Sequence, residues 1–87
     1  MCRNIKQLHN FAPPATDEEI RAAAIQFVRK VSGFQKPSAV NVEVFESAID
    51  EITFVSKKLL AELVTNSPPK DREVEREKAR ERNRRRF

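Results

Sequence analysis

The stretch MCRNIKQLHNFAPPAT opens this 87-residue chain and holds the side chains best suited to chemistry. Cys2 supplies a thiol and, if Met1 is removed, also a free amine, so that the pair could act as a nucleophile or a nitrogen–sulfur chelate. Arg3 would favour the thiolate form, while Asn4 and His9 add an amide and an imidazole. Cys2, Arg3, Asn4 and His9 therefore form a candidate binding site.

The same stretch lacks the partners that catalysis requires. A zinc site needs at least about three protein ligands, whereas Cys2 and His9 supply two. No acidic residue and no second His lies near them in the sequence. We therefore expect no catalytic residue, no metal and no cofactor, and cysteine chemistry at the N-terminus ranks third among the functions considered.

Composition favours one small helical domain. The chain has one Gly, no Trp and no Tyr, and it is rich in the good helix formers Ala, Glu, Lys and Arg. A single Cys excludes an internal disulfide framework and is typical of a reducing compartment. No apolar run reaches the roughly 18 residues of a membrane-spanning helix, and MCRNIK lacks the apolar stretch of a secretory signal. We expect a cytoplasmic protein that does not enter membranes.

Residues 17–32 carry the clearest helix signal. The sequence TDEE predicts a capping box between Thr16 and Glu19, and Gly33 stands where a left-handed residue would end the helix. Apolar residues with helical spacing follow the cap, namely Ile20, Ala24, Phe27, Val28 and Val31.

A second helix is predicted over about residues 40–65, after a turn at FQKPS. Ser38 or Asn41 could cap it, and the sequence does not decide between them. Its apolar stripe consists of Phe45, Ala48, Ile49, Ile52, Val55, Leu59, Leu60 and Leu63. The prolines of NSPP end the pattern.

The leader, residues 1–15, is predicted to form a strap. Two helices joined by a short turn fold back as an antiparallel hairpin, and lengths of about 24 and 39 Å leave about 15 Å of the second helix overhanging the first. The overhang carries Leu59, Leu60, Leu63 and Val64. Ile5, Leu8 and Phe11, spaced by three, could be presented together on one helical turn and cover it. We therefore expect Leu8 and Phe11 to be core residues.

Residues 67–87 are predicted to be a charged, solvated tail beyond a hairpin domain of residues 1–66. Residues 1–70 carry a net charge of about +1 and residues 71–87 about +3. The tail offers Glu–Arg pairs at i,i+3 but no apolar stripe, so a helix there would have nothing to pack. Nucleic acid is the second-ranked partner, through Arg80, Arg82, Arg84, Arg85 and Arg86, although the tail lacks interleaved aromatic residues for stacking on bases.

These observations predict an all-α fold, an antiparallel helical hairpin with an irregular N-terminal strap and a charged C-terminal helix or tail. A thin core and a wide apolar stripe favour a non-catalytic interaction or assembly module with an unidentified protein partner. Homodimerisation would cover the part of the stripe that one short helix cannot. That stripe includes Phe45, Ile49, Ile52, Phe54, Val55 and Leu59.

Three words in this order, MCRNIK-LHNF-PPAT, QFVRKVSGF-KPS and PPKDREVE, resemble a family of small, mostly bacterial proteins known as a conserved domain of unknown function. The resemblance spans nearly the whole chain. It implies a small cytosolic helical protein, and it implies no activity, cofactor or catalytic residue.

Overall fold

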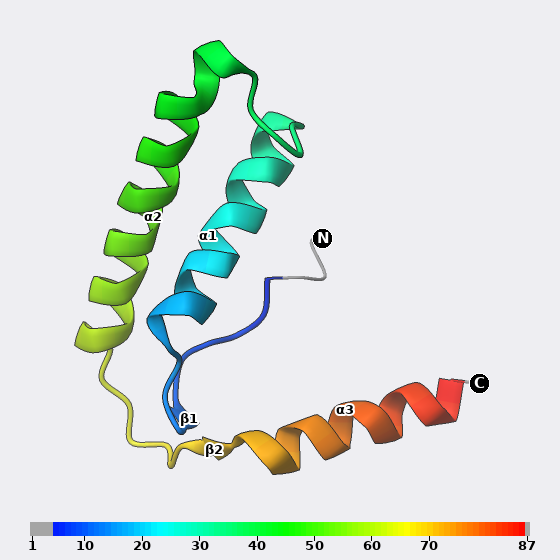
Figure 1. Ribbon diagram of the computed structural model, residues 1–87. Coiled ribbons are helices and arrows are strands. Elements are labelled where there is room, and N and C mark those ends of the chain that lie inside the picture. The colour runs from blue at the N-terminus through cyan, green and yellow to red at the C-terminus, as the bar shows by residue number, and fades with distance from the viewer. Residues whose placement is uncertain (1–4, 87) are drawn as a thin grey trace.

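The structure, a computed structural model, describes residues 5–86, and this part of the chain is mostly helical (Figure 1). The helices are α1 (Asp17–Ser32), α2 (Val42–Glu62) and α3 (Arg72–Arg86). A short 3-10 helix, η1 (Ala39–Asn41), precedes α2. Strands β1 (Phe11–Ala12) and β2 (Lys70–Asp71), of two residues each, pair in parallel. The predicted all-α fold is confirmed, with this small sheet as an addition.

Both ends of α1 are capped as the sequence predicts. The Glu19 amide donates to the Thr16 hydroxyl at 3.1 Å, and the Thr16 amide donates to the Glu19 carboxylate at 2.9 Å. Gly33 has φ of 80°, and its amide donates to the carbonyl of Arg29 at 2.8 Å. The positive φ explains glycine at this position, since side chains with a Cβ rarely adopt it.

Helix α2 is shorter than predicted at both ends. It ends at Glu62 because Leu63 is extended, with ψ of 137°. Pro68 disfavours helix at Ser67, and the amide of Ser67 donates to the Thr65 hydroxyl at 3.1 Å instead of continuing a helix. At about 1.5 Å per residue, α2 exceeds α1 by about 7 Å, half the predicted overhang.

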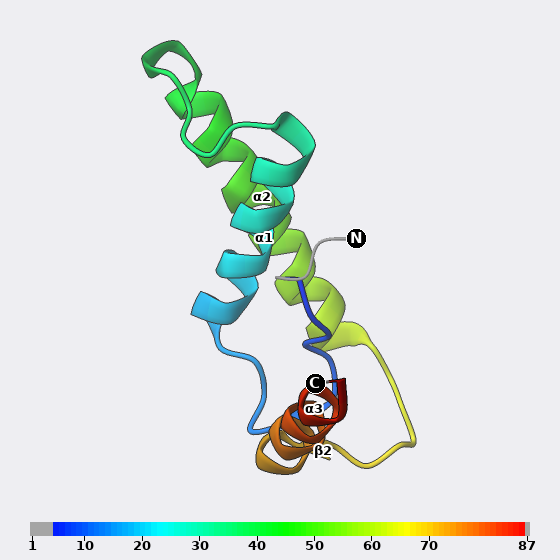
Figure 2. The same cartoon turned by 90° about the vertical axis from the view of Figure 1, so that its right-hand side faces the viewer.

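Helices α1 and α2 lie side by side and antiparallel, and the core sits between them (Figures 1 and 2). The buried apolar residues of the described chain are Ile20, Ala24, Val28, Phe45 and Ile49. Ala24, Val28, Phe45 and Ile49 form one cluster, and the half-buried Ile25, Ala48 and Ile52 pack against it. The core is therefore one seam between two helices.

The leader covers less of the overhang than predicted. Leu60 is half-buried and lines a cavity together with leader residues 8–11, whereas the other apolar residues of the overhang are exposed. Leu59, Leu63 and Val64 are 55%, 44% and 92% exposed. Leu8 and Phe11 are half-buried and lie outside the buried core, and the helical turn suggested by their spacing is not formed. The predictions of full cover, of Leu8 and Phe11 as core residues and of a helical turn in the leader are therefore wrong. The overhang is short, and the leader runs instead toward β2, with which β1 pairs.

Helix α3 projects from the base of the hairpin, away from α1 and α2 (Figure 1). The leader descends beside α1 to β1, so that it lies between the hairpin and α3 (Figures 1 and 2). Among the described helices, none is long and apolar enough to cross a membrane.

Candidate functional site

A turn at Asn10 joins the leader to the segment before α3. Asn10 has φ of 64°, a left-handed conformation that Asn tolerates better than most residues. Its side-chain amide donates to the carbonyls of Ser67 at 3.3 Å and Pro68 at 3.2 Å, and its own carbonyl accepts from the Lys70 amide at 2.8 Å. Asn10 thereby sets the register in which Phe11 pairs with Lys70.

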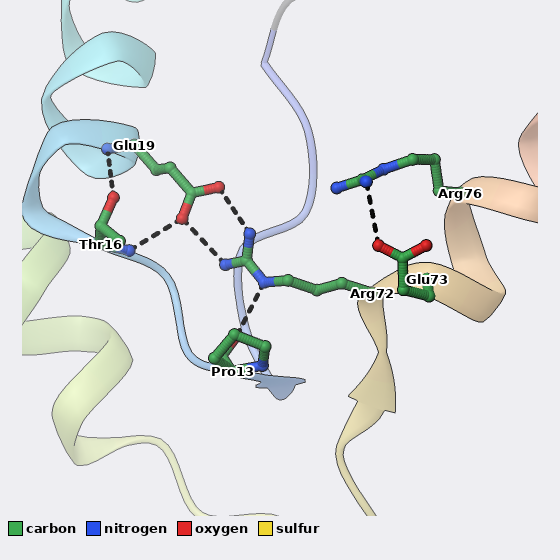
Figure 3. A network of polar contacts seen from close by, with 6 residues as sticks. All are labelled: Pro13, Thr16, Glu19, Arg72, Glu73 and Arg76. Carbon is green, nitrogen blue, oxygen red and sulfur yellow. Dashed lines mark hydrogen bonds and ion pairs between the residues drawn. The ribbon is translucent and has the colours of Figure 1, made fainter.

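Arg72, the first residue of α3, clamps the leader to α1 (Figure 3). Its two terminal nitrogens donate to the two carboxylate oxygens of Glu19 at 2.8 and 2.9 Å, a bidentate arrangement. Its Nε donates to the carbonyl of Pro13 at 2.7 Å. One guanidinium therefore joins the start of α3 to the leader and α1, which lie more than 50 positions away in the sequence.

The clamp stabilises the charged form of Glu19. Hydrogen bonds from Arg72, and then from the Thr16 amide, lower the pKa of Glu19 to about 2, against a smaller effect of desolvation. The same pairing raises the pKa of Arg72. The side chains of Glu19 and Arg72 are 26% and 25% exposed, which makes theirs the most sheltered ion pair within residues 5–86.

Asp71 caps α3 and orients its inner face toward the leader. The Asp71 carboxylate accepts from the amides of Glu73 at 2.8 Å and Val74 at 3.1 Å. Arg72, Glu75 and Ala79 are half-buried at helical spacing, so they define that face. The expectation that α3 has nothing to pack is therefore wrong for this face, although the predicted boundary at residue 66 stays a prediction.

A cavity of about 360 Å³ lies between the leader, the first turn of α1 and α3. Five cationic side chains line it, namely Lys6, Lys70, Arg72, Arg76 and Arg82. Glu19 and Glu75 are its acidic residues, and Leu8, Phe11 and Ala79 supply apolar surface. We call this space the cationic cavity.

Phe11 lines the cationic cavity, and two cationic side chains lie over its ring. The Lys70 ammonium and the Arg72 guanidinium each lie 5.9 Å from the ring centroid, within the range of a cation–π contact. Lys70 also donates to the Gln7 side chain at 3.4 Å. The half-buried Phe11 thus helps to position the cations of the cavity.

The hairpin has one charged and one apolar flank. On the charged flank, Arg21 pairs with Asp50 at 2.7 Å and with Glu46 at 3.2 Å. Around α2, Val44 lies about 100° from the buried Phe45 in the direction opposite to Glu46. Around α1, Phe27 and Arg21 lie about 60° to opposite sides of Ala24.

Along α2, Val55 and Leu59 lie on the same side of the helix as Val44, and Ala48 lies on that side between Val44 and Val55. The exposed fractions of Phe27, Val44, Val55 and Leu59 are 47%, 70%, 62% and 55%. We call these four residues with the half-buried Ala48 the apolar flank. Phe54, 69% exposed, borders it on the outer side of α2.

The structure brings only part of the predicted N-terminal site into view. Cys2, Arg3 and Asn4 lie outside the described residues. His9 is half-buried and lines a second cavity, of about 350 Å³, between the leader and the adjoining ends of α1 and α2. The cysteine-chemistry hypothesis stays a prediction.

The predicted nucleic-acid residues lie along α3, and several are engaged with acids of their own helix. Arg80 pairs with Glu77, and Arg84 and Arg85 pair with Glu81. Arg82 makes no ion pair within residues 5–86 and lines the cationic cavity. The side chain of Arg86 lies outside the described part of the chain. Nucleic-acid binding through these residues also stays a prediction.

Sequence reasoning missed the clamp itself. Asp71 followed by Arg72 carries the usual signal of a helix N-cap, which could have placed the start of α3. The pairing of Glu19 with Arg72 spans 53 positions in the sequence, and no local pattern predicts it. Glu19 fits the capping-box pattern, and that pattern gives no sign that the same carboxylate also pairs with Arg72.

The fold and its clamp define a small, mostly helical protein in which a charged helix is held to a helical hairpin through the leader. Residues 1–78 match the family described as Uncharacterized conserved protein (DUF2277), and the chain belongs to that family. This confirms the resemblance to a domain of unknown function. The match includes the clamp and ends before Arg80. Comparisons with curated proteins and with solved structures find no significant match.

Proposed function

We propose that this protein is a non-catalytic assembly module that self-associates through its apolar flank. The observation that carries the proposal is that Phe27, Val44, Val55 and Leu59 are exposed on one side of the hairpin, opposite the Arg21 ion pairs. An apolar surface gathered on one face is typical of a contact site, whereas scattered single residues are not. Covering it would also add to a core that has five buried apolar side chains within residues 5–85.

Charge favours a second copy of the chain as the occupant. Glu51 and Lys58 lie seven positions apart at the border of the flank, and neither forms an ion pair within residues 5–86. An antiparallel pair of α2 helices with its two-fold axis midway between them places Glu51 of each copy level with Lys58 of the other. Val55 and Phe54 then lie beside the axis.

The same two-fold axis also places a large side chain of one copy opposite a small side chain of the other. Leu59 of one copy lies within about 3 Å, along the helix, of the level of Ala48 in the other. An isologous contact of this kind closes on itself and produces a dimer rather than a filament. The leader does not compete for the flank, because it is paired with β2 and clamped by Arg72.

Sedimentation equilibrium at micromolar concentration tests the proposal. The parent chain should sediment at about twice its 10.1 kDa monomer mass. Val55→Lys should return it to the monomer mass, because two ammonium groups would meet beside the axis. Val64→Lys, the same change at a 92% exposed position beyond α2, is the matched control and should leave the dimer unchanged.

Charge reversal identifies the partner as a second copy. Glu51→Lys and Lys58→Glu should each weaken the dimer, since each places like charges opposite one another, and the double variant should restore it. A monomer at every concentration contradicts self-association. Equal effects of Val55→Lys and Val64→Lys contradict the assignment to the apolar flank.

A further inference from the structure

The cationic cavity is built for a ligand rather than for packing alone. Within its lining, five cations face two carboxylates. Both carboxylates are already engaged, Glu19 by Arg72 and Glu75 by Lys78 at 3.4 Å. Lys6 and Arg82 form no ion pair in the described part of the chain, and they lie on the leader and on α3 respectively. A net positive charge therefore remains at the mouth of the cavity.

The remaining lining is apolar and incompletely covered. Leu8, Phe11 and Ala79 are half-buried, although each contributes surface to the cavity. A third space, of about 320 Å³, lies on the α1 side of the leader and shares Lys6, Leu8 and Glu19 with the cationic cavity. Leu8 thus has open space on both sides, and an apolar group in the cationic cavity would bury it further.

Two further cations are already positioned by the protein. Figure 3 shows Arg76 reaching from α3 in the same direction as Arg72, with its guanidinium held by Glu73 at 3.2 Å. Arg72 is fixed by Glu19 and Pro13, so its position costs no ordering when a ligand arrives. Preorganised guanidinium groups are suited to carboxylate and phosphate.

From this arrangement we propose that the cationic cavity binds a small organic anion, one carboxylate or phosphate group on a compact apolar body. The anionic group lies between Lys6, Arg76 and Arg82, and the apolar body contacts Leu8 and Ala79. A volume of about 360 Å³ is at the small end of the range for small-molecule sites, which suits a body the size of one aromatic ring. The bound anion joins the leader to α3 at a second point beyond the Arg72 clamp.

Calorimetric titration of the full chain with phenyl phosphate and with benzoate tests the proposal, with amide chemical shifts locating the site. At least one of these anions should saturate at one molecule per chain and shift the amides of the leader and of α3. Inorganic phosphate should bind about tenfold more weakly, because it lacks the apolar body, and phenol should show no saturation.

Arg82→Gln and Arg80→Gln provide a matched pair on the same helix. Arg82→Gln should lower the affinity for the aromatic anion by about tenfold, which is the effect expected from losing one charge-assisted hydrogen bond. Arg80→Gln removes the same charge from a residue paired with Glu77 and should change the affinity little.

Three results would overturn the proposal. One is the absence of saturable binding by both aromatic anions, and another is equal affinity for inorganic phosphate. The third is equal loss in the Arg82 and Arg80 variants. The third result, combined with affinity for single-stranded RNA that rises with oligonucleotide length, would assign α3 to nucleic-acid binding instead.

Discussion

The hairpin and α3 are held in place by different forces. Between α1 and α2, four buried apolar side chains, Ala24, Val28, Phe45 and Ile49, pack along one seam. Between α3 and the rest of the molecule, the contacts are polar and centre on the first turn of the helix, where Arg72 meets Glu19 and Pro13. The two regions therefore differ in both the kind and the distribution of their contacts.

The comparison shows how a helix without an apolar stripe acquires a fixed position. Burial of one large apolar side chain contributes about 1.5–3 kcal/mol, so the seam accounts for most of the stability of the hairpin. The bidentate pair of Arg72 and Glu19 is directional and fixes the orientation of α3 relative to α1, but it consists of few contacts. We expect α3 to undock locally while the hairpin remains folded.

The largest effect is expected from the seam. Ile49→Ala removes a side chain that is 4% exposed and should lower the free energy of unfolding by about 2–5 kcal/mol. Urea denaturation followed by circular dichroism measures this change. A loss below about 1 kcal/mol would show that the seam does not dominate stability.

Loss of the clamp should affect α3 selectively. Arg72→Ala should accelerate amide exchange throughout α3 several-fold and leave the exchange of α1 and α2 nearly unchanged. Glu19→Gln is the matched partner, because Gln preserves the capping box while removing the charge. Exchange measured by NMR reports each helix separately, and equal acceleration in all helices would show that the regions do not unfold independently.

Acid should undock α3 before the hairpin seam responds. The pKa of Glu19 in the folded protein, about 2, lies below its ordinary value of 4.5, so its stabilising effect is complete above pH 4.5 and is lost as the pH falls toward 2. The Arg72 Nε–H resonance should report the loss over that range. The Glu19→Gln variant should lack this dependence, and Glu73→Gln, at an exposed pair, should retain it.

The smallest effect on the hairpin is expected from removal of residues 70–87. Truncation after Pro69 should leave its denaturation midpoint nearly unchanged, because the five side chains that are buried in the described part of the chain all lie at or before Ile49. The amide of Ala12 should exchange faster, because β1 loses its partner strand. A large fall in the midpoint would show that α3 supports the seam.

Local signals made the hairpin predictable. The capping box, the αL glycine and the spacing of Ile20, Ala24 and Val28 depend on neighbours within a few residues. They predict both observed ends of α1, and the predicted apolar stripe includes its three buried residues, although Phe27 and Val31 of that stripe are 47% and 70% exposed. For α2 the pattern predicts a helix that is too long at both ends, because η1 replaces its first predicted residues and the extended Leu63 ends it before the proline pair.

Long-range contacts were not predictable from periodicity. The leader was expected to follow apolar surface, whereas hydrogen bonds from Asn10 and Arg72 directed it to β2 and α3. A polar clamp has no sequence period, since its partners stand far apart in the chain. On α2, by contrast, helical geometry predicts that Val55 and Phe54 cannot both face α1, and both are exposed. Phe45 and Ile49, from the same predicted stripe, are buried in the core instead.

Intermolecular nuclear Overhauser effects in a mixture of labelled and unlabelled chains test self-association through the apolar flank most directly. We predict contacts from the Val55 and Leu59 methyl groups of one copy to the Phe54 ring and Ala48 of the other. Absence of any intermolecular contact at micromolar to millimolar concentration, or contacts confined to α3, would contradict the account.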